Sequence, residues 1–139
     1  MEKINYSLDT NVFTDILRKD RHVIANMERA LKNGAELFID SIVYYEISRW
    51  LRFANHPKQL KEFETLYANN LTHIYFDRND MRVIEKSIEI YNQLRNGRLI
   101  EDSDIFIAAI AMVNGCTLVT ANEQHFSRIE GLRYVNWRN

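Results

Sequence analysis

The chain has 139 residues, a formal net charge of −1 and a hydrophobic fraction of 46%. This length suits one compact domain, residues 1–139, and the composition excludes a disordered chain. The near-zero charge excludes a global basic field for nucleic acid, so any such contact has to be local. Cys116 is the only cysteine, which excludes an internal disulfide and fits a reducing cytoplasm. The longest apolar run, residues 105–113, falls short of the ~20 residues of a membrane span, so we expect a soluble protein.

Strands and helices are expected to alternate along the chain. We expect a strand at residues 4–8, helices at 10–18 and 22–32, a strand at 36–39, and helices at 41–54 and from 57 to about 67. A strand at 73–76, helices at 79–94 and 102–113, and strands at 116–119 and 132–135 complete the chain. This alternation predicts an α/β fold, a three-layer α/β/α sandwich with a central, mostly parallel sheet.

Four polar residues are expected at one edge of this sheet. Asp9 follows the first strand, and Asn122 follows the fourth. Glu46 and Asp104 lie in early turns of helices that begin at the same edge. Because ligands of open parallel sheets bind beyond the carboxyl ends of the strands, the sequence predicts a site where these residues meet.

Each acid also has a purely structural interpretation. Asp9 is a favoured residue for capping the helix that follows it. Glu46 interrupts an apolar helical stripe, where a buried ion pair with an arginine would account for it. Asp102 and Asp104 both favour the positive N-terminus of their helix. We expect Asp102 to be its N-cap, and Asp104, which is closer to the apolar face, to be functional.

Three acids at one edge are harder to explain by structure alone. Clustered carboxylates raise one another's pKa unless a cation lies among them. Oxygen ligands favour Mg²⁺ or Mn²⁺, and the four histidines show no metal spacing, so we interpret them as surface or core polar residues. Such ions activate water for phosphate chemistry. The residues therefore predict metal-assisted hydrolysis, with Asp9, Glu46 and Asp104 as the metal ligands.

Four stretches together resemble the PIN-domain nucleases, most closely the VapC-type toxins of prokaryotic toxin–antitoxin pairs. They are "LDTNVFTDIL", "SIVYYEI", "EDSDIFIAAIAMVNGCTLVTANEQHF" and "IEGLRYVNW". The resemblance covers nearly the whole chain, and the motifs keep the order and spacing that they have in the family. It implies a parallel α/β/α sandwich and a Mg²⁺- or Mn²⁺-dependent endoribonuclease that hydrolyses RNA phosphodiester bonds. The catalytic acids of the family fall on Asp9, Glu46 and Asp104.

The last motif departs from the family pattern. Family members often carry a fourth acid in the region where this chain has Asn122, whose amide oxygen can ligate a metal but brings no charge. This leaves open whether one or two metals bind, and Asp102 is the other candidate ligand. Thr10, Asn11 and Thr120 would orient Asp9 or a metal-bound water.

Partners are implied by the same resemblance. It implies a homodimer and an antitoxin that lays a peptide or helix into an apolar groove. Arginines are the candidate contacts for RNA phosphates, and Arg95 and Arg98 are the best placed, beside the turn at residues 96–97. The alternative is that Arg95 and Arg98 are ordinary surface arginines in contact with solvent.

Two other functions stay open. A haloacid-dehalogenase-type phosphatase also has an Asp at the end of its first strand, but it needs a second Asp two residues later, where this chain has Asn11. A folded module that binds RNA or a partner would have lost catalysis together with the fourth acid. An RNA cleavage assay separates this module from the nuclease.

Overall fold

A five-stranded, all-parallel sheet forms the centre of the protein, in the order β3-β2-β1-β4-β5. The structure is a computed structural model, and it describes residues 3–76 and 81–139. The strands are β1 (Asn5–Leu8), β2 (Glu36–Asp40), β3 (Leu71–Ile74), β4 (Thr117–Val119) and β5 (Tyr134–Val135). The predicted α/β fold is confirmed, with every strand pair parallel.

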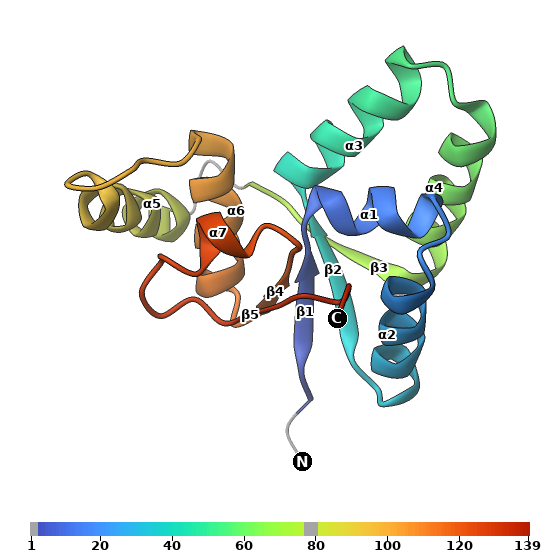
Figure 1. Ribbon diagram of the computed structural model, residues 1–139, viewed down its shortest axis with the longest axis horizontal. Helices are drawn as coiled ribbons and strands as arrows, with labels where there is room; N and C mark the ends of the chain where they lie inside the picture. The colour runs from blue at the N-terminus through green and yellow to red at the C-terminus, as the bar shows by residue number, and fades with distance from the viewer. Residues whose placement is uncertain (1–2, 77–80) are drawn as a thin grey trace.

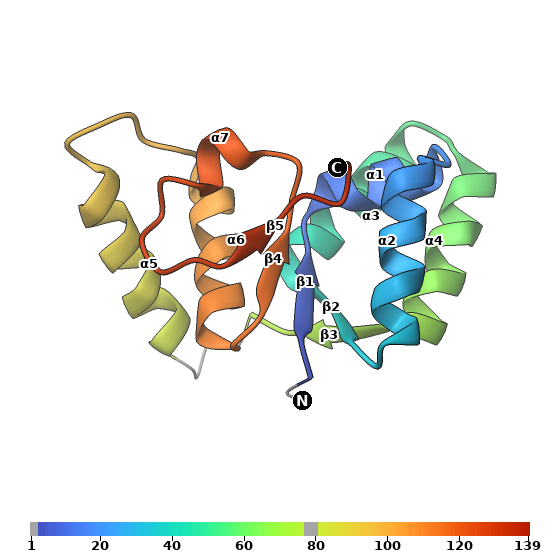
Figure 2. The ribbon, with the colours of Figure 1, turned by 60° about the horizontal axis from the view of Figure 1, so that its bottom comes forward.

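Helices cover both faces of this sheet. They are α1 (Thr10–Leu17), α2 (Arg21–Lys32), α3 (Ser41–Phe53), α4 (Pro57–Asn70), α5 (Met81–Leu94), α6 (Asp102–Val113) and α7 (Glu123–Phe126). In both ribbon views α1, α2 and α4 lie on one side of the sheet, and α5 and α6 on the other (Figures 1 and 2). This gives the three layers predicted from the sequence. None of the helices within residues 3–76 and 81–139 is long and apolar enough to cross a membrane.

Aspartates begin three of the helices. The side chains of Asp9, Asp20 and Asp40 accept hydrogen bonds from backbone N–H groups in the first turns of α1, α2 and α3. Such caps satisfy donors that have no partner within the helix, and each is worth about 1 kcal/mol. Two of these caps, Asp9 and Asp40, directly follow strands, so the same residues that start the helices lie at the carboxyl edge of the sheet.

The core holds the strand ends rigidly. Leu8, Ile39 and Leu118 on the three inner strands are fully buried, and α6 packs its buried side chains against α5 and β4. Burying a side chain of this size contributes roughly 1.5–3 kcal/mol. The polar residues that follow these strands are therefore attached to the least mobile part of the fold.

Most expected elements are found within one or two residues of their expected bounds. The strand expected at residues 73–76 is Leu71–Ile74, because α4 continues to Asn70 and leads directly into it. The shift of two residues keeps the same side chains on each face, since strands repeat every two residues. Residues 79–80 of the helix expected at 79–94 lie outside the described residues. The helix α7 was not expected, because its four residues are too few to show a helical period.

Candidate active site

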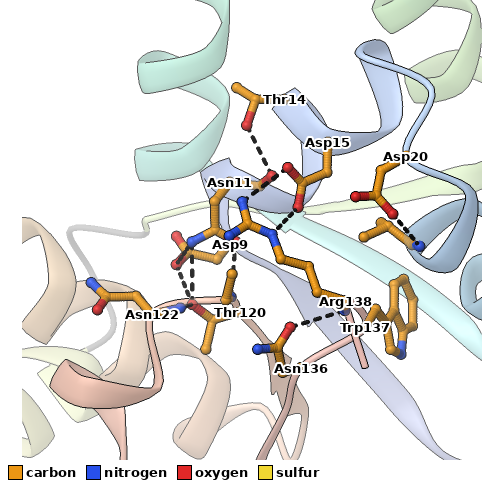
Figure 3. A network of polar contacts seen from close by, with 12 residues as sticks. Asp9, Asn11, Thr14, Asp15, Asp20, Thr120, Asn122, Asn136, Trp137 and Arg138 are labelled. Atoms are coloured by element: carbon orange, nitrogen blue, oxygen red, sulfur yellow. Dashed lines mark hydrogen bonds and ion pairs between the residues drawn. The ribbon is translucent and has the colours of Figure 1, made fainter.

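Asp9 lies at the carboxyl end of β1 and is almost fully buried. One carboxylate oxygen accepts a hydrogen bond from the backbone N–H of Thr10 at 2.8 Å. The other accepts from the hydroxyl of Thr120 at 2.8 Å and from the side-chain amide of Asn11 at 3.2 Å (Figure 3). The expected capping of α1 by Asp9 is confirmed. The hydroxyl of Thr120, which follows β4, also holds the carboxylate, so residues at the ends of two strands fix its position.

Asn11 ties the start of α1 to the segment after β4. Its Nδ2 donates to Asp9, and its Oδ1 accepts from the backbone N–H of Ala121 at 3.0 Å. Thr120 is fully buried, and its hydroxyl also accepts from the backbone N–H of Asn122 at 3.0 Å. Asn11 and Thr120 therefore make the contacts to Asp9 that the sequence predicted for them.

Glu46 projects from the second turn of α3 and is half-buried. Its Oε1 accepts a hydrogen bond from the hydroxyl of Thr10 at 2.7 Å. The side-chain contact that the described residues 3–76 and 81–139 show for Glu46 is therefore with a neutral hydroxyl. Thr10 bonds Asp9 through its backbone and Glu46 through its side chain, so it sets the spacing of the two acids.

Asp104 lies in the first turn of α6, with 19% of its side chain exposed. Its Oδ2 is 3.1 Å from Nδ1 of His125, and the same Nδ1 is 2.9 Å from Nδ2 of Asn122. A series of polar contacts therefore links the three acids, and its members in order are Glu46, Thr10, Asp9, Thr120, Asn122, His125 and Asp104. The sequence predicted that these acids meet, and the structure places all three at the same edge of the sheet. Their role as metal ligands stays a prediction.

Asp102 does not cap α6 in the structure, and its alternative role as a metal ligand stays a prediction. It is the first residue of α6 and is exposed, whereas the N-cap is Glu101, which makes no side-chain capping bond. The prediction that Asp102 caps the helix is therefore wrong by one residue. The reason is that Glu101 already has the extended backbone of a cap, with φ −65° and ψ 151°. Asp102 and Asp104 both lie where the helix dipole favours negative charge.

Asp40 is a further acid at this edge, and sequence reasoning missed it. It ends β2 with no exposed surface, and its Oδ1 caps α3 by accepting from the backbone N–H of Val43 at 2.8 Å. Its Oδ2 has no hydrogen-bond partner within the described part of the chain. The strand register pairs Ser7 with Phe38, so continuing it by two residues brings Asp9 opposite Asp40. Neighbouring strands lie about 4.8 Å apart, so the two carboxyl groups are close.

Burial and the charges of neighbouring carboxylates make Asp9 and Asp40 hard to ionise. Burial, partly offset by the Thr120 and Thr10 hydrogen bonds, raises the pKa of Asp9 from 3.8 to about 6, and the charges of Asp104 and Glu46 add to the rise. Burial likewise raises the pKa of Asp40 from 3.8 to about 7, with a contribution from the charges of Asp9 and Glu46. The carboxylates therefore lie close enough to destabilise one another, and a cation placed among them would relieve that cost.

The acids point to protein partners rather than to a common centre. Within residues 3–76 and 81–139, no three His, Cys, Asp or Glu side chains lie close enough to hold a metal ion together. The reason is visible in two contacts, because Glu46 is held by Thr10 and Asp104 by His125. The carboxylates share one polar chain and one electrostatic field, but their oxygens do not converge.

Basic residues line a hollow beside this acidic edge. It has a volume of about 390 Å³, and its lining includes Arg98, Arg128 and His125. Arg128 donates a hydrogen bond to the backbone oxygen of Arg98, which joins the two segments. Arg95 is exposed and does not line this hollow. Of the two arginines singled out in the sequence, the structure brings Arg98 next to the site, through His125.

A partly buried ion pair fastens the C-terminal segment to α1. Arg138 donates from Nε and Nη2 to the two carboxylate oxygens of Asp15, at 2.6 and 2.9 Å (Figure 3). Asp15 is 7% exposed and lies one helical turn beyond Asn11. The pair neutralises a buried charge close to the acids and fixes the segment after β5 against the helix that Asp9 caps.

Comparison with known proteins gives consistent matches over nearly the whole chain. The family model described as "PIN domain" matches residues 6–132. A protein of Haemophilus influenzae named ribonuclease VapC2 is 27% identical over 135 residues, which cover 96% of this chain and 98% of that protein.

Two solved structures have similar folds. VapBC2 from Rickettsia felis bound to a DNA fragment from its promoter contains a chain with a TM-score of 0.84 and 26% identity, covering 96% of this chain and 99% of that one. DNA-bound VapBC from Salmonella typhimurium gives a TM-score of 0.76 and 25% identity, covering 96% of this chain and 98% of that one.

Proposed function

The chain belongs to the PIN-domain family, and on this premise we propose that it is a metal-dependent endoribonuclease and the toxin of a toxin–antitoxin pair. One observation carries the proposal: a series of polar contacts links Asp9, Glu46 and Asp104 at the carboxyl edge of the sheet. The ribonuclease names of the relatives support the choice of RNA as substrate.

The chemistry of the donor atoms suits Mg²⁺ or Mn²⁺. Asp9, Glu46 and Asp104 would hold the ion, with Asn122 as a neutral fourth donor, and hard oxygen ligands suit these metals. The pKa of Asp9 is raised in part by the charges of Glu46 and Asp104, which is the repulsion that a bound cation relieves. When bound, such an ion supplies an activated water and stabilises the charge that develops on the phosphate.

The chain's own residues position this acidic site. Thr10 holds Glu46 and Asp9 at a set spacing, while Thr120 and Asn11 fix the rotamer of Asp9 from the other side. Because Asp9 is 5% exposed, water reaches it poorly, and its interaction with a cation is correspondingly strong. These contacts fix the position of Asp9, whereas Glu46 and Asp104 are more exposed and each contact one polar side chain, Thr10 and His125.

The hollow beside His125 is the proposed path for the RNA backbone. Arg98 and Arg128 bring two positive charges to its wall, next to the acidic edge. Arginine binds phosphate through paired N–H groups, and such contacts position a nucleic acid without reading its sequence. Arg98 is therefore the better candidate of the two arginines singled out in the sequence, and Arg128 joins it.

An antitoxin partner is supported by the solved relatives, which are VapBC complexes. A groove of about 490 Å³ between α1 and α4 offers apolar side chains from Ile16, Leu17 and Leu66. Lys58 and Lys61 line the same groove. This combination suits an amphipathic segment with acidic residues flanking its apolar face. Pairing of the chain with itself stays a prediction.

The phosphatase alternative has little support from the contacts of Asp9. Both of its carboxylate oxygens accept hydrogen bonds, and it is too buried for a nucleophile that must be phosphorylated. Asn11, which occupies the position of the second acid, uses both ends of its amide to join α1 to the segment after β4. The binding-module alternative keeps the same fold, so only an activity measurement separates it from the nuclease.

RNA cleavage tests the proposal directly. The purified protein is incubated with labelled single-stranded and structured RNAs in Mg²⁺, Mn²⁺ or EDTA, beside Asp9→Asn and Asp104→Asn. We expect cleavage that requires metal and falls about 100-fold or more in both variants. Asp20→Asn, which exchanges the capping aspartate of α2, is the matched control and should cleave like the wild type. Metal-independent cleavage, or cleavage that survives in both variants, would contradict the proposal.

A further inference from the structure

Two aromatic rings are stacked at the end of β3. The ring centroids of His73 and Tyr75 lie 4.1 Å apart, with an angle of 21° between the ring planes, which is a nearly parallel stack. Both side chains project to the same face because they are two residues apart along an extended segment. His73 is half-buried, whereas Tyr75 is 72% exposed. The stack therefore rests on the protein through His73 and presents the ring of Tyr75 to solvent.

The inner ring of this stack is held in place on several sides. Nε2 of His73 is 2.8 Å from the hydroxyl oxygen of Ser41, and Nδ1 is 2.9 Å from the hydroxyl oxygen of Tyr67. The rings of Tyr44 and Tyr67 also pack against His73, with centroids 5.6 and 5.9 Å away. Burial lowers the pKa of His73, which favours the neutral imidazole. His73 therefore gives Tyr75 a fixed and uncharged surface to lie on.

The stack lies at the same edge of the sheet as the catalytic acids of the proposed function. The strand register pairs Asp40 with Ile74, so Tyr75 is one residue beyond the position opposite Asp40. The register of β1 and β2 brings Asp9 opposite Asp40 on the other side. Neighbouring strands are about 4.8 Å apart, so the backbone of Tyr75 is roughly 10 Å from that of Asp9.

The face of α3 that begins at this stack carries a positive charge. Ser41, which contacts His73, is followed at intervals of four residues by Tyr45 and Arg49, so the three lie along one face of the helix. Tyr45 is 60% exposed, and the guanidinium carbon of Arg49 lies 5.0 Å from the centre of its ring. Exposed aromatic rings combined with positive charge are typical of surfaces that bind single-stranded nucleic acids.

We propose that Tyr75, supported by His73, is a stacking site for an unpaired base of the RNA substrate. The inference rests on the proposed function and adds a base-binding residue to it. In the sheet, Asp9 on β1 lies between β3 on one side and β4, which leads to α7 and the hollow beside it, on the other. A single strand that crosses this edge brings a phosphodiester to the acids and a neighbouring base to Tyr75.

This stacking site determines which form of RNA is bound, but it does not read the sequence. Every base has an aromatic face, so a stacking contact adds affinity for all four bases. A base inside a double helix is already stacked on its neighbours and is not free to turn toward Tyr75. We therefore expect Tyr75 to strengthen the binding of single-stranded RNA and to contribute nothing to the binding of duplex RNA.

RNA binding in EDTA, followed by fluorescence anisotropy of a labelled short single strand, tests the site without cleavage. Tyr75→Ala should weaken binding about tenfold, which corresponds to the loss of one stacked base. Tyr75→Phe keeps the ring and should bind within about twofold of the wild type. Tyr91→Ala, which removes an exposed tyrosine of α5, is the matched control and should bind like the wild type.

Removing single bases from the RNA identifies the contact. An abasic nucleotide is placed at successive positions of the strand. At one position it should weaken binding to the wild type about tenfold and leave binding to Tyr75→Ala almost unchanged, because both changes remove the same stack. Duplex RNA should bind equally to the wild type and to Tyr75→Ala.

The outcomes separate this inference from the proposed function. Single-stranded RNA that binds Tyr75→Ala as tightly as the wild type, or Tyr75→Phe as weakly as Tyr75→Ala, overturns the stacking site, and metal-dependent cleavage by the wild type would still support the nuclease. RNA that binds through Tyr75 but is not cleaved in Mg²⁺ or Mn²⁺ overturns the nuclease and leaves the stacking site intact. A change in oligomeric state by light scattering in Tyr75→Ala, with RNA binding unchanged, would assign the ring to a contact between copies of the chain and overturn the inference.

Discussion

Replacing Asp40 by Asn should change how the stability of the protein depends on pH. Asp40 is fully buried, caps α3 through one carboxyl oxygen and has its other oxygen unpartnered within the described residues. Asn has the same shape and is an equally good capping residue, so the substitution keeps the cap and removes the ionisable group. The variant therefore isolates the cost of ionising a carboxyl group inside the fold.

The magnitude follows from the raised pKa. Burial raises the pKa of Asp40 from 3.8 to about 7, so between these values the folded protein keeps a proton that the unfolded chain releases. The unfolded state then binds fewer protons, and the free energy of unfolding falls as pH rises through this window. The full difference is about 4 kcal/mol, of which about 3 kcal/mol is lost between pH 5 and pH 8. The Asp40→Asn variant should not show this loss of stability between pH 5 and pH 8.

Urea unfolding followed by circular dichroism, in EDTA at pH 5, 6, 7 and 8, measures the effect. We expect the stability of Asp40→Asn relative to the wild type to rise by about 3 kcal/mol from pH 5 to pH 8. Asp20→Asn, which changes the half-buried cap of α2, should instead follow the wild-type curve. A stability difference between Asp40→Asn and the wild type that is equal at pH 5 and pH 8 would refute the reasoning, because Asp40 would then ionise as readily folded as unfolded.

Three further substitutions test other contacts. Thr10→Val removes the hydroxyl that holds Glu46, so RNA cleavage should fall about tenfold. Thr14→Val, on the same helix, should cleave RNA at the wild-type rate. Equal cleavage rates in the two variants would show that the Thr10–Glu46 hydrogen bond does not position Glu46. Arg98→Ala should weaken RNA binding and lower the salt slope of the binding constant by about one, whereas Arg95→Ala should leave the binding constant and its slope unchanged. A larger loss of binding in Arg95→Ala than in Arg98→Ala would contradict this prediction. Arg138→Ala leaves the buried carboxylate of Asp15 without its ion-pair partner and should lower the free energy of unfolding in urea by about 2 kcal/mol. An unchanged urea midpoint would show that the pair does not stabilise the fold.

The placement of the three acids at one edge of the sheet could be predicted because topology alone decides it. In a parallel α/β fold, the ends of strands and the starts of the following helices share one edge, so Asp9, Glu46 and Asp104 had to lie there. The partner of Glu46 could not be predicted. Several kinds of side chain can hydrogen-bond a half-buried carboxylate, and Thr10 does so here because α1 packs against α3.

Asp40 and His125 show two different limits of sequence reasoning. The triplet Ile39-Asp40-Ser41 repeats the pattern of Leu8-Asp9-Thr10, an apolar residue, Asp and a hydroxyl residue between a strand and a helix. This signal was present and could have identified Asp40. For His125 there was no comparable signal, because it lies on a four-residue helix and meets Asp104, 21 positions earlier, only through the fold.

The order of the strands divides the acidic site between two parts of the sequence. Asp9, Asp40 and Glu46 come from β1, β2 and α3, whereas Thr120, Asn122 and Asp104 come from the part of the chain after α5. The two parts meet where β1 pairs with β4, the position at which the strand order changes direction. Two complementary fragments, one ending after β3 and the other beginning at α5, would each lack at least one acid. Cleavage by such a split protein would report that its halves have reassembled along β1 and β4.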